Sequence, residues 1–300
     1  MQRKPQCNMK EIVVISGKGG TGKTSITAAF AQLTAKESVI AHCDVDEADM
    51  HLLLKPDFAS GEAFYSGHLA HIDMEKCTRC FKCKKACRFD AIHVDDGTFS
   101  VDEIDCEGCG YCEKICPVQA IKMYDALSGK TYISSTRLKN TLVHAELEIA
   151  AENSGKLVTR VKTLARENAK QEEKEYLLID GTPGIGCPVT ASVTGAHYVV
   201  IVTEPSMSGL HDLKRAIDLI GHFSIPAGLI INKSDLNEEI TEEIKAYAEE
   251  LGIELLSMIP YNENFVKALV QAKTIVEYDP ELKETVVDTW NAVKKTVDKT

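Results

Sequence analysis

Residues 10–24, KEIVVISGKGGTGKT, join a short apolar run to a glycine-rich turn that ends in lysine and threonine. The apolar run is rich in β-branched residues and predicts a buried strand, while the spacing of SITAAFAQLTAKE after the turn predicts a helix. SVIAHCDVD follows and predicts a second buried strand, which ends in aspartates. A strand, a helix and a strand in this order predict a parallel sheet with a right-handed crossover.

The same alternation of strands and helices returns in the second half of the chain. Short apolar runs occur at 175–180, 197–204, 226–232 and 253–260, and helical spacing at 156–171, 210–223, 238–252 and 280–299. We therefore expect an α/β fold with a doubly wound, mostly parallel sheet that is interrupted in its middle. The expected parts are residues 1–70, a small inserted α+β domain at 71–125, and residues 126–300, which open with a strand or hairpin and a loop.

The composition excludes several classes of protein. Its 34 basic and 45 acidic side chains give a net charge of −11, which argues against nucleic-acid binding over the whole surface. No run of about 18 apolar residues is present, and no apolar leader precedes the first strand, so neither a membrane span nor secretion is expected. Eight of the 11 cysteines crowd into residues 77–116. In a cytoplasmic protein, which we expect here, such crowding indicates metal or cluster ligation.

The glycine-rich turn matches the pattern G-x-x-x-x-G-K-S/T between a strand and a helix. Its backbone N–H groups and the helix N-terminus would face phosphate oxygens. Lys23 is expected to reach the β- and γ-phosphates, and the Thr24 hydroxyl to ligate Mg²⁺. A turn that merely joins strand and helix is the alternative. The candidate nucleotide-binding residues of the loop are Gly17, Lys18, Gly19, Gly20, Thr21, Gly22, Lys23, Thr24 and Ser25.

Lys18 is a second lysine within this loop. With it, the sequence resembles the MinD/ParA/Mrp and nitrogenase-iron-protein superfamily of P-loop ATPases, whose loop has the form KGGxGKT. In that superfamily the extra lysine reaches across a dimer interface to the partner's nucleotide. The resemblance therefore implies that Lys18 acts in trans on the transition state and that ATP favours a homodimer. A solvated lysine on the loop is the alternative.

Three aspartates fall where this superfamily has its acidic residues. Asp44 and Asp46 resemble the switch I acids, which orient the attacking water or hold Mg²⁺ through water, and Asp46 resembles the hydrolytic acid of the MinD branch. Asp180 ends an apolar run and matches the Walker B and switch II position, where it would hold Mg²⁺ through water. Gly184 would then permit a turn that responds to the γ-phosphate. Asp-Gly at a strand end is also ordinary turn chemistry.

The segment INKSDL, residues 231–236, bears on the nucleotide base. Asn-Lys-x-Asp after a strand is typical of guanine recognition in GTPases. It also occurs in ATPases with the double-lysine loop, where the asparagine contacts adenine. Asn232 and Lys233 are therefore candidate base-site residues, and the loop favours ATP and ADP over the guanine nucleotides.

The cysteines form two runs with the spacing C-x₂-C-x₂-C-x₃-C, about 29 residues apart. This is the bacterial two-cluster ferredoxin pattern, in which the fourth cysteine of each run ligates the other cluster. Zinc is the competing interpretation, because paired cysteines also make tetrahedral zinc sites. One 4Fe–4S cluster is expected on Cys77, Cys80, Cys83 and Cys116. The other is expected on Cys87, Cys106, Cys109 and Cys112.

The two runs differ in the charges around them. The first carries Lys76, Arg79, Lys82, Lys84, Lys85 and Arg88, with arginine in place of the pattern's proline. Acidic residues flank the second. The first run is either a docking face for an acidic partner or a solvated surface. Cys187 matches a cluster cysteine of the nitrogenase iron protein. The second ligand cysteine needed there is missing outside the two runs, so no intersubunit cluster is expected.

Two functions fit these features. The first is an ATPase whose nucleotide-driven dimerisation gates electron transfer through the two clusters to a partner protein. The second is a carrier or scaffold that delivers iron–sulfur clusters to an acceptor protein, as the Mrp-like relatives are thought to do. A positional switch at the membrane is less favoured, because the C-terminal stretch contains Asp, Glu and Pro rather than a basic amphipathic helix.

Overall fold

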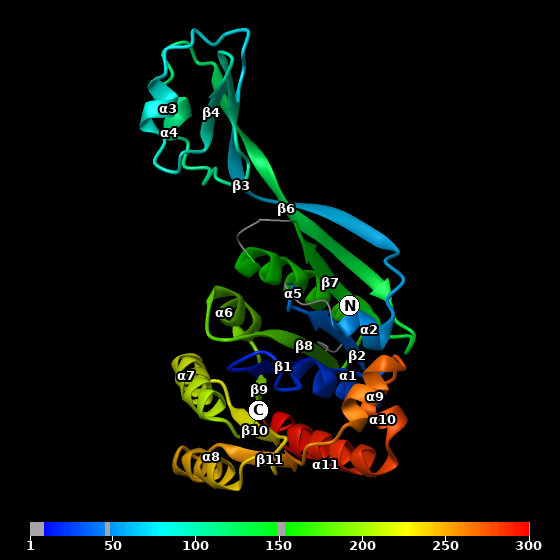
Figure 1. Cartoon of the computed structure of the whole chain (residues 1–300). Coiled ribbons are helices and arrows are strands. Elements are labelled where there is room, and N and C mark those ends of the chain that lie inside the picture. Colours follow the sequence, from blue (N-terminus) through cyan, green and yellow to red (C-terminus); the bar gives the residue numbers. More distant parts are fainter. Residues whose placement is uncertain (1–8, 46–48, 149–153, 300) are drawn as a thin grey trace, which may run out of the picture. The chain divides into compact units, whose positions relative to one another are not determined.

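The computed structural model in Figure 1 describes residues 9–45, 49–148 and 154–299. The chain divides into two compact units. Described residues within 1–62, 131–146 and 154–300 form the first unit, and those within 63–130 and 147–153 form the second. The insertion expected at 71–125 lies inside the second unit. The unit borders fall further out because strands β3 (Ser60–Ile72) and β6 (Ile121–Ser135) continue through both expected boundaries.

The first unit is built on a parallel sheet. The strand order is β11-β10-β9-β1-β8-β2-β7-β6-β3, and β1 pairs in parallel with both β8 and β9. The chain thus builds outward from β1 in both directions, which confirms the expected doubly wound, mostly parallel sheet. The remaining strands are β1 (Lys10–Ser16), β2 (Ser38–His42), β7 (Thr141–Leu147), β8 (Tyr176–Pro183), β9 (Tyr198–Thr203), β10 (Ala227–Asn232) and β11 (Glu254–Ile259).

Helices cover both faces of this sheet; Figure 1 shows α5, α6 and α7 on one side and α1 with α9 and α11 on the other. Strand side chains alternate, so Ile12 and Val14 join the core beneath α1 and α11 while Val13 faces the opposite layer. The helices of the first unit are α1 (Lys23–Leu33), α2 (Asp49–Leu54), α5 (Ser154–Gln171), α6 (Cys187–Val193), α7 (Met207–Phe223), α8 (Glu238–Glu250), α9 (Asn264–Val270), α10 (Ile275–Tyr278) and α11 (Pro280–Val297).

The segment 126–155 contains the expected hairpin, formed by β6 and β7. The loop expected after it falls largely outside the described residues, and α5 then begins at Ser154. The short helices α9 and α10 lie in a stretch where the sequence pattern indicated no element.

The second unit repeats its backbone as well as its sequence. Each cysteine run contains a short helix, α3 (Lys82–Ala86) or α4 (Tyr111–Ile115), and strands β4 (Ile92–Asp95) and β5 (Thr98–Val101) pair between the runs. Left-handed residues recur at equivalent places, with φ of 57° at Arg79 and 61° at Gly108. Both runs therefore follow the same path around the space that their cysteines line.

The apolar core of the second unit is small. Its buried members are Ala70, Ile72, Ile92, Phe99 and Ile121. Cysteines 77, 83, 87, 106, 112 and 116 pack against this core. So few aliphatic side chains give a unit of this size little stability from apolar burial alone.

Trp290 packs α11 against the core of the first unit. It is 4% exposed, and its ring lies 5.2 Å from Phe30 and 5.3 Å from Tyr176 between centroids. We expect Trp290→Ala to lower the free energy of unfolding by about 3–5 kcal/mol, measured by urea denaturation followed by far-ultraviolet circular dichroism. The exposed Asp288→Ala on the same helix should change it by less than about 0.5 kcal/mol. Equal values for the two variants would contradict this packing role.

Candidate functional site

The glycine-rich turn lies between β1 and α1 and lines a cavity of about 580 Å³, including the open space at its mouth. Two positions require glycine. A Cβ on Gly17 would lie 2.6 Å from Cβ of Asp212 in α7, and one on Gly22, where φ is 94°, would lie 2.5 Å from Nδ2 of Asn232. The cavity is lined by Ser16, Gly19, Gly20, Thr21, Gly22, Lys23, Thr24, Ser25, Asp44 and Pro183.

Lys23 sits between the two acids that the sequence placed near it. Its Nζ lies 3.1 Å from Oδ1 of Asp180 and 3.2 Å from Oδ2 of Asp44, and the side chain is 6% exposed. Burial alone would lower the pKa of Lys23, but the two carboxylates raise it overall. The lysine is therefore a fixed positive charge at the floor of the loop.

Asp180 lies in the buried part of β8, and its carboxylate accepts hydrogen bonds from side chains of two elements, α1 and β2. Besides Lys23, its carboxylate accepts hydrogen bonds from the hydroxyls of Thr24 and Thr27 and from Nδ1 of His42, each at 3.0 Å. Complete burial would raise its pKa, yet Lys23 and His42 bring that pKa down to about 2. Asp180 is thus ionised across the physiological range.

Asp44 and Gly184, two further candidate switch residues, lie at the loop. Burial raises the pKa of Asp44, although Lys23 pulls it in the opposite direction. Gly184 has a φ of 88°, and its N–H donates to the carbonyl of Ser16 at 2.9 Å, so the turn after β8 lies against the loop. Asp46 lies outside the described residues. Among the described residues, the buried hydroxyls of Thr21 and Thr182 have no hydrogen-bond partner, and Thr21 lines the cavity, where it leaves a donor for a ligand.

Lys18 is bound within its own chain. Its Nζ lies 2.6 Å from Oε1 of Glu204, 3.0 Å from the Ser206 hydroxyl and 3.1 Å from the Ser208 hydroxyl. Burial would raise the pKa of Glu204, but Lys18 and Lys233 lower it overall. The sequence analysis missed Glu204 and the two serines. They follow β9, which pairs with β1, so their position at the same edge of the sheet could have indicated that they lie near the loop.

Asn232 and Lys233 brace the loop. Asn232 is 5% exposed and donates from Nδ2 to the carbonyl of Thr21 at 2.8 Å. Nζ of Lys233 lies 3.0 Å from the carbonyl of Gly20 and 2.7 Å from Oε2 of Glu204. In this conformation both side chains support the phosphate loop.

The cysteines of the second unit gather around two cavities and form no disulfides among the described residues. One cavity, of about 330 Å³, is lined by Cys77, Cys80, Cys83 and Cys116. The other, of about 400 Å³, is lined by Cys87, Cys106, Cys109 and Cys112. Each set draws three cysteines from one run and the fourth from the other, the same grouping that the spacing predicted.

The spread of the sulfurs bears on what these cavities hold. A tetrahedral zinc ion with bonds of about 2.3 Å would bring its sulfurs to about 3.8 Å from one another. No three cysteine sulfurs lie within 4.8 Å of one another; within the described residues only His93, Asp102 and Asp105 offer ligand atoms that close. The thiols are thus spaced more widely than the four sulfurs around a tetrahedral zinc ion.

Backbone donors and burial act on the same sulfurs. The N–H of Arg79 donates to Sγ of Cys77 at 3.4 Å, and that of Ala120 to Sγ of Cys116 at 3.3 Å. Burial raises the pKa of the Cys83 and Cys112 thiols. Because metals bind thiolates, loading these cavities would release protons.

The remaining cysteines do not join these sets. Cys187 is exposed at the start of α6, and Cys43 is buried after β2, where burial raises its pKa to about 12. Cys7 lies outside the described residues. No helix in the part of the chain that the structure describes is long and apolar enough to cross a membrane.

Comparison with other proteins places the chain among nucleotide-binding proteins. The family model of the CobQ/CobB/MinD/ParA nucleotide binding domain matches residues 12–275. The uncharacterized protein MJ0578 of Methanocaldococcus jannaschii is 32% identical over 288 residues, covering 95% of this chain and 96% of its own. MJ0579 of the same organism is 24% identical over 276 residues, covering 90% and 93%.

Solved structures agree in fold. The septum site-determining protein MinD of Pyrococcus horikoshii, complexed with Mg-ADP, superposes with a TM-score of 0.57 at 18% identity over 96% of both chains. Apo McdA of Cyanothece gives a TM-score of 0.57 at 14% identity over 95% of this chain and all of its own. These likenesses match the parallel α/β sheet described above. The chain therefore belongs to the CobQ/CobB/MinD/ParA nucleotide-binding family.

Proposed function

We propose that this protein is an ATP-hydrolysing iron–sulfur protein whose nucleotide-dependent homodimer couples ATP turnover to electron transfer through two 4Fe–4S clusters to a partner protein. The observation that carries the proposal is the presence, in one chain, of a phosphate loop closed by Asp180 and of two cavities that are each lined by four cysteines.

The nucleotide part rests on the charges at the loop. Lys23 is held by carboxylates that phosphate oxygens would replace as its partners. Thr24 would ligate Mg²⁺ directly, with Asp44 and Asp180 acting through water, and the ion would neutralise charge on the phosphates. The double-lysine loop favours ATP over GTP. The MinD relative named above, which was solved with Mg-ADP, is consistent with this choice.

The dimer part rests on Lys18. In the structure its charge is satisfied by Glu204, Ser206 and Ser208 of the same chain. We infer that the phosphates of a partner's nucleotide compete with Glu204 for this lysine. ATP would then favour the dimer by offering more negative charge than one carboxylate.

The iron–sulfur part rests on the two cysteine sets, their wide sulfur spacing and the small apolar core around them. When bound, such clusters accept and release single electrons. The chain's own residues would hold them through thiolates, and the amides of Arg79 and Ala120 would stabilise the negative charge on sulfur.

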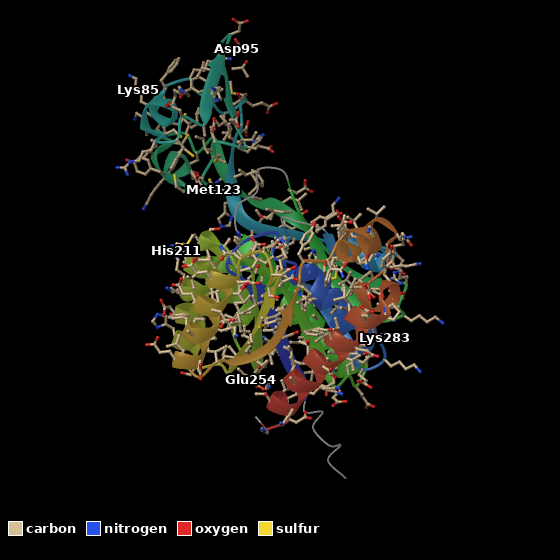
Figure 2. All side chains as sticks on the ribbon, turned by 60° about the horizontal axis from the view of Figure 1, so that its bottom comes forward. Lys85, Asp95, Met123, His211, Glu254 and Lys283 are labelled. Atoms are coloured by element: carbon tan, nitrogen blue, oxygen red, sulfur yellow. The ribbon has the colours of Figure 1, made fainter. Side chains whose placement is uncertain are left out.

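The electron-transfer partner is inferred from surface charge. Exposed lysines and arginines surround the first cysteine run, and Figure 2 shows Lys85 pointing outward from the second unit. Only part of this charge is balanced within the unit, by contacts such as Lys84–Asp90 at 3.5 Å and Lys76–Asp73 at 2.7 Å. An acidic protein surface fits this face best.

Cluster delivery is the second candidate. The observation that favours it is the exposure of Cys80 and Cys109, one in each set, through which an acceptor protein could reach a cluster. A carrier should lose iron to an apo-acceptor protein during ATP turnover, whereas an electron-transfer protein should retain it.

The two loop lysines should act at different steps. Lys23→Ala should weaken ATP binding by at least about 10-fold, because it removes a buried charged donor. Lys18→Ala should bind ATP normally but lose about 10³-fold or more in hydrolysis, as expected for a charge supplied in trans. Calorimetry, steady-state hydrolysis and size exclusion with ATP measure these effects.

Glu204→Gln is the matched variant for Lys18. It keeps the lysine and removes its competing charge, so dimers should form at lower ATP concentration than in the wild type. ATP-driven dimers that persist in Lys18→Ala would contradict a role in trans.

A second prediction concerns metal content. Protein prepared without oxygen should contain about eight iron and eight sulfide per chain. Cys83→Ser and Cys112→Ser should each reduce this content, whereas Cys187→Ser, an exposed cysteine outside both sets, should not. Stoichiometric zinc under strict anaerobiosis would overturn the iron–sulfur assignment.

A third prediction concerns the reduction potentials of the two clusters. The cluster on Cys77, Cys80 and Cys83 should be the easier to reduce, because nearby cations stabilise the added electron. Replacing Lys82, Lys84 and Lys85 with glutamine should lower its potential by on the order of 10 mV per lysine, less at higher salt. Redox titration followed by electron paramagnetic resonance measures this. The same change at Lys283, Lys294 and Lys295 of α11 is the control; equal shifts in both variants would refute the charge argument.

A further inference from the structure

Three histidines from three elements of the first unit form a series of contacts that runs from Asp180 to the β6–β7 hairpin. His42 ends β2, His51 belongs to α2, and His144 belongs to β7. None of the nucleotide chemistry proposed above uses His51 or His144. Their arrangement therefore needs its own explanation.

The contacts run from the nucleotide site to a strand. His42 donates from Nδ1 to Oδ2 of Asp180, since a carboxylate can only accept, and its ring meets the edge of His51 at 5.9 Å between centroids. Nε2 of His51 lies 2.9 Å from Nδ1 of His144. Nε2 of His144 lies 2.9 Å from the hydroxyl of Ser134 in β6.

Aromatic rings surround His51 and His144, the two histidines farther from Asp180. Phe58 packs edge-on against His51 and His144 at 5.1 and 4.9 Å, and Tyr132 stacks on His144 at 5.1 Å. Burial lowers the pKa of His51 to about 4 and that of His144 to about 3. Both imidazoles are therefore neutral near pH 7.

A neutral imidazole has one donor and one acceptor nitrogen, so the two hydrogen bonds that join His51, His144 and Ser134 have two possible arrangements. Either His51 donates to His144 and His144 to Ser134, or both hydrogen bonds run in the opposite direction. Such a chain is an element with two discrete states. The ring nitrogens of His51 and His144 point at each other rather than at a common centre, and no ligand group within the described residues includes them. The cluster is thus no metal site.

We propose that His51 and His144 are positioning residues that couple the nucleotide site to the β6–β7 hairpin. A shift of the Asp180 carboxylate when nucleotide binds would move His42, which is hydrogen-bonded to it, and His42 would move the ring of His51. His144 and Ser134 then pass the change to β7 and β6. Ser134 lies near the end of β6, and this strand begins at Ile121, five residues after Cys116. Strand β6 is thus the polypeptide link between this contact and the cysteine runs. The proposal rests on nucleotide binding at the loop but not on the presence of clusters.

The test is hydrogen exchange of the full chain, read by mass spectrometry in peptides covering 121–135 and 141–147. Mg-ATP should slow exchange in these peptides of the wild type at least about twofold. His51→Leu should bind ATP within about threefold of the wild type yet lose this response. His51→Gln, which restores a donor at the position of Nε2, should recover most of it.

The matched control is His211→Leu. His211 is an exposed histidine on α7 of the same unit (Figure 2), and its loss should leave the response unchanged. A wild-type response that survives in His51→Leu would overturn the proposal, as would ATP binding without any response in the wild type.

A second comparison needs no nucleotide. Asp180→Asn should alter exchange in the same two peptides when His51 is present and leave it unchanged in the His51→Leu background. If ATP does not bind, only the proposed function is contradicted, because the comparison of Asp180→Asn with and without His51 needs no nucleotide and still tests the coupling. Equal effects of Asp180→Asn in both backgrounds would refute it.

Discussion

The carboxylate of Asp180 is the charge on which the nucleotide site depends. A fully buried carboxylate is tolerated only when its oxygens are paired and hydrogen-bonded, and here Lys23, Thr24, Thr27 and His42 fill that role. These donors come from α1 and from the end of β2. Pairing therefore fixes the loop, the helix that follows it and the neighbouring strand in one arrangement around a single group. Removing any one partner would leave the others bound to an undercompensated charge.

The second unit is organised by a different constraint. Its buried apolar side chains are few, and its cysteines pack where a larger core would be. Left-handed residues such as Arg79 and Gly108 bend each run so that three sulfurs line one cavity, while the fourth lines the other. A group bound in either cavity would tie the two runs together through the exchanged fourth cysteine. Binding such groups would then stabilise this unit, whereas the first unit has a packed core of its own.

Much of this could be predicted from local pattern. The order β1, α1 and β2 follows from apolar spacing and the glycine turn, and the two cysteine sets follow from residue spacing alone. The contact of Lys18 with Glu204 and the histidine chain did not follow, because each joins segments that only the folded sheet brings together. The second compact unit extends beyond the predicted insertion at 71–125 for a related reason. A change of composition marks where the cysteines begin, but β3 and β6 continue as strands beyond it.

Lys18 and the histidines share one physical feature, which is that the structure already satisfies them. Lys18 has Glu204, and His51 has His144, so neither group is left unpaired when the chain is alone. A ligand can shift such an equilibrium only by the difference in its affinity for the two states. In the proposed function, phosphate charge would supply that difference at the loop by competing with carboxylates for both lysines. The histidine chain adds no driving force. Because both of its directions keep the two hydrogen bonds that join His51, His144 and Ser134, it can follow the loop at little cost. This makes it suited to carrying a change that begins elsewhere.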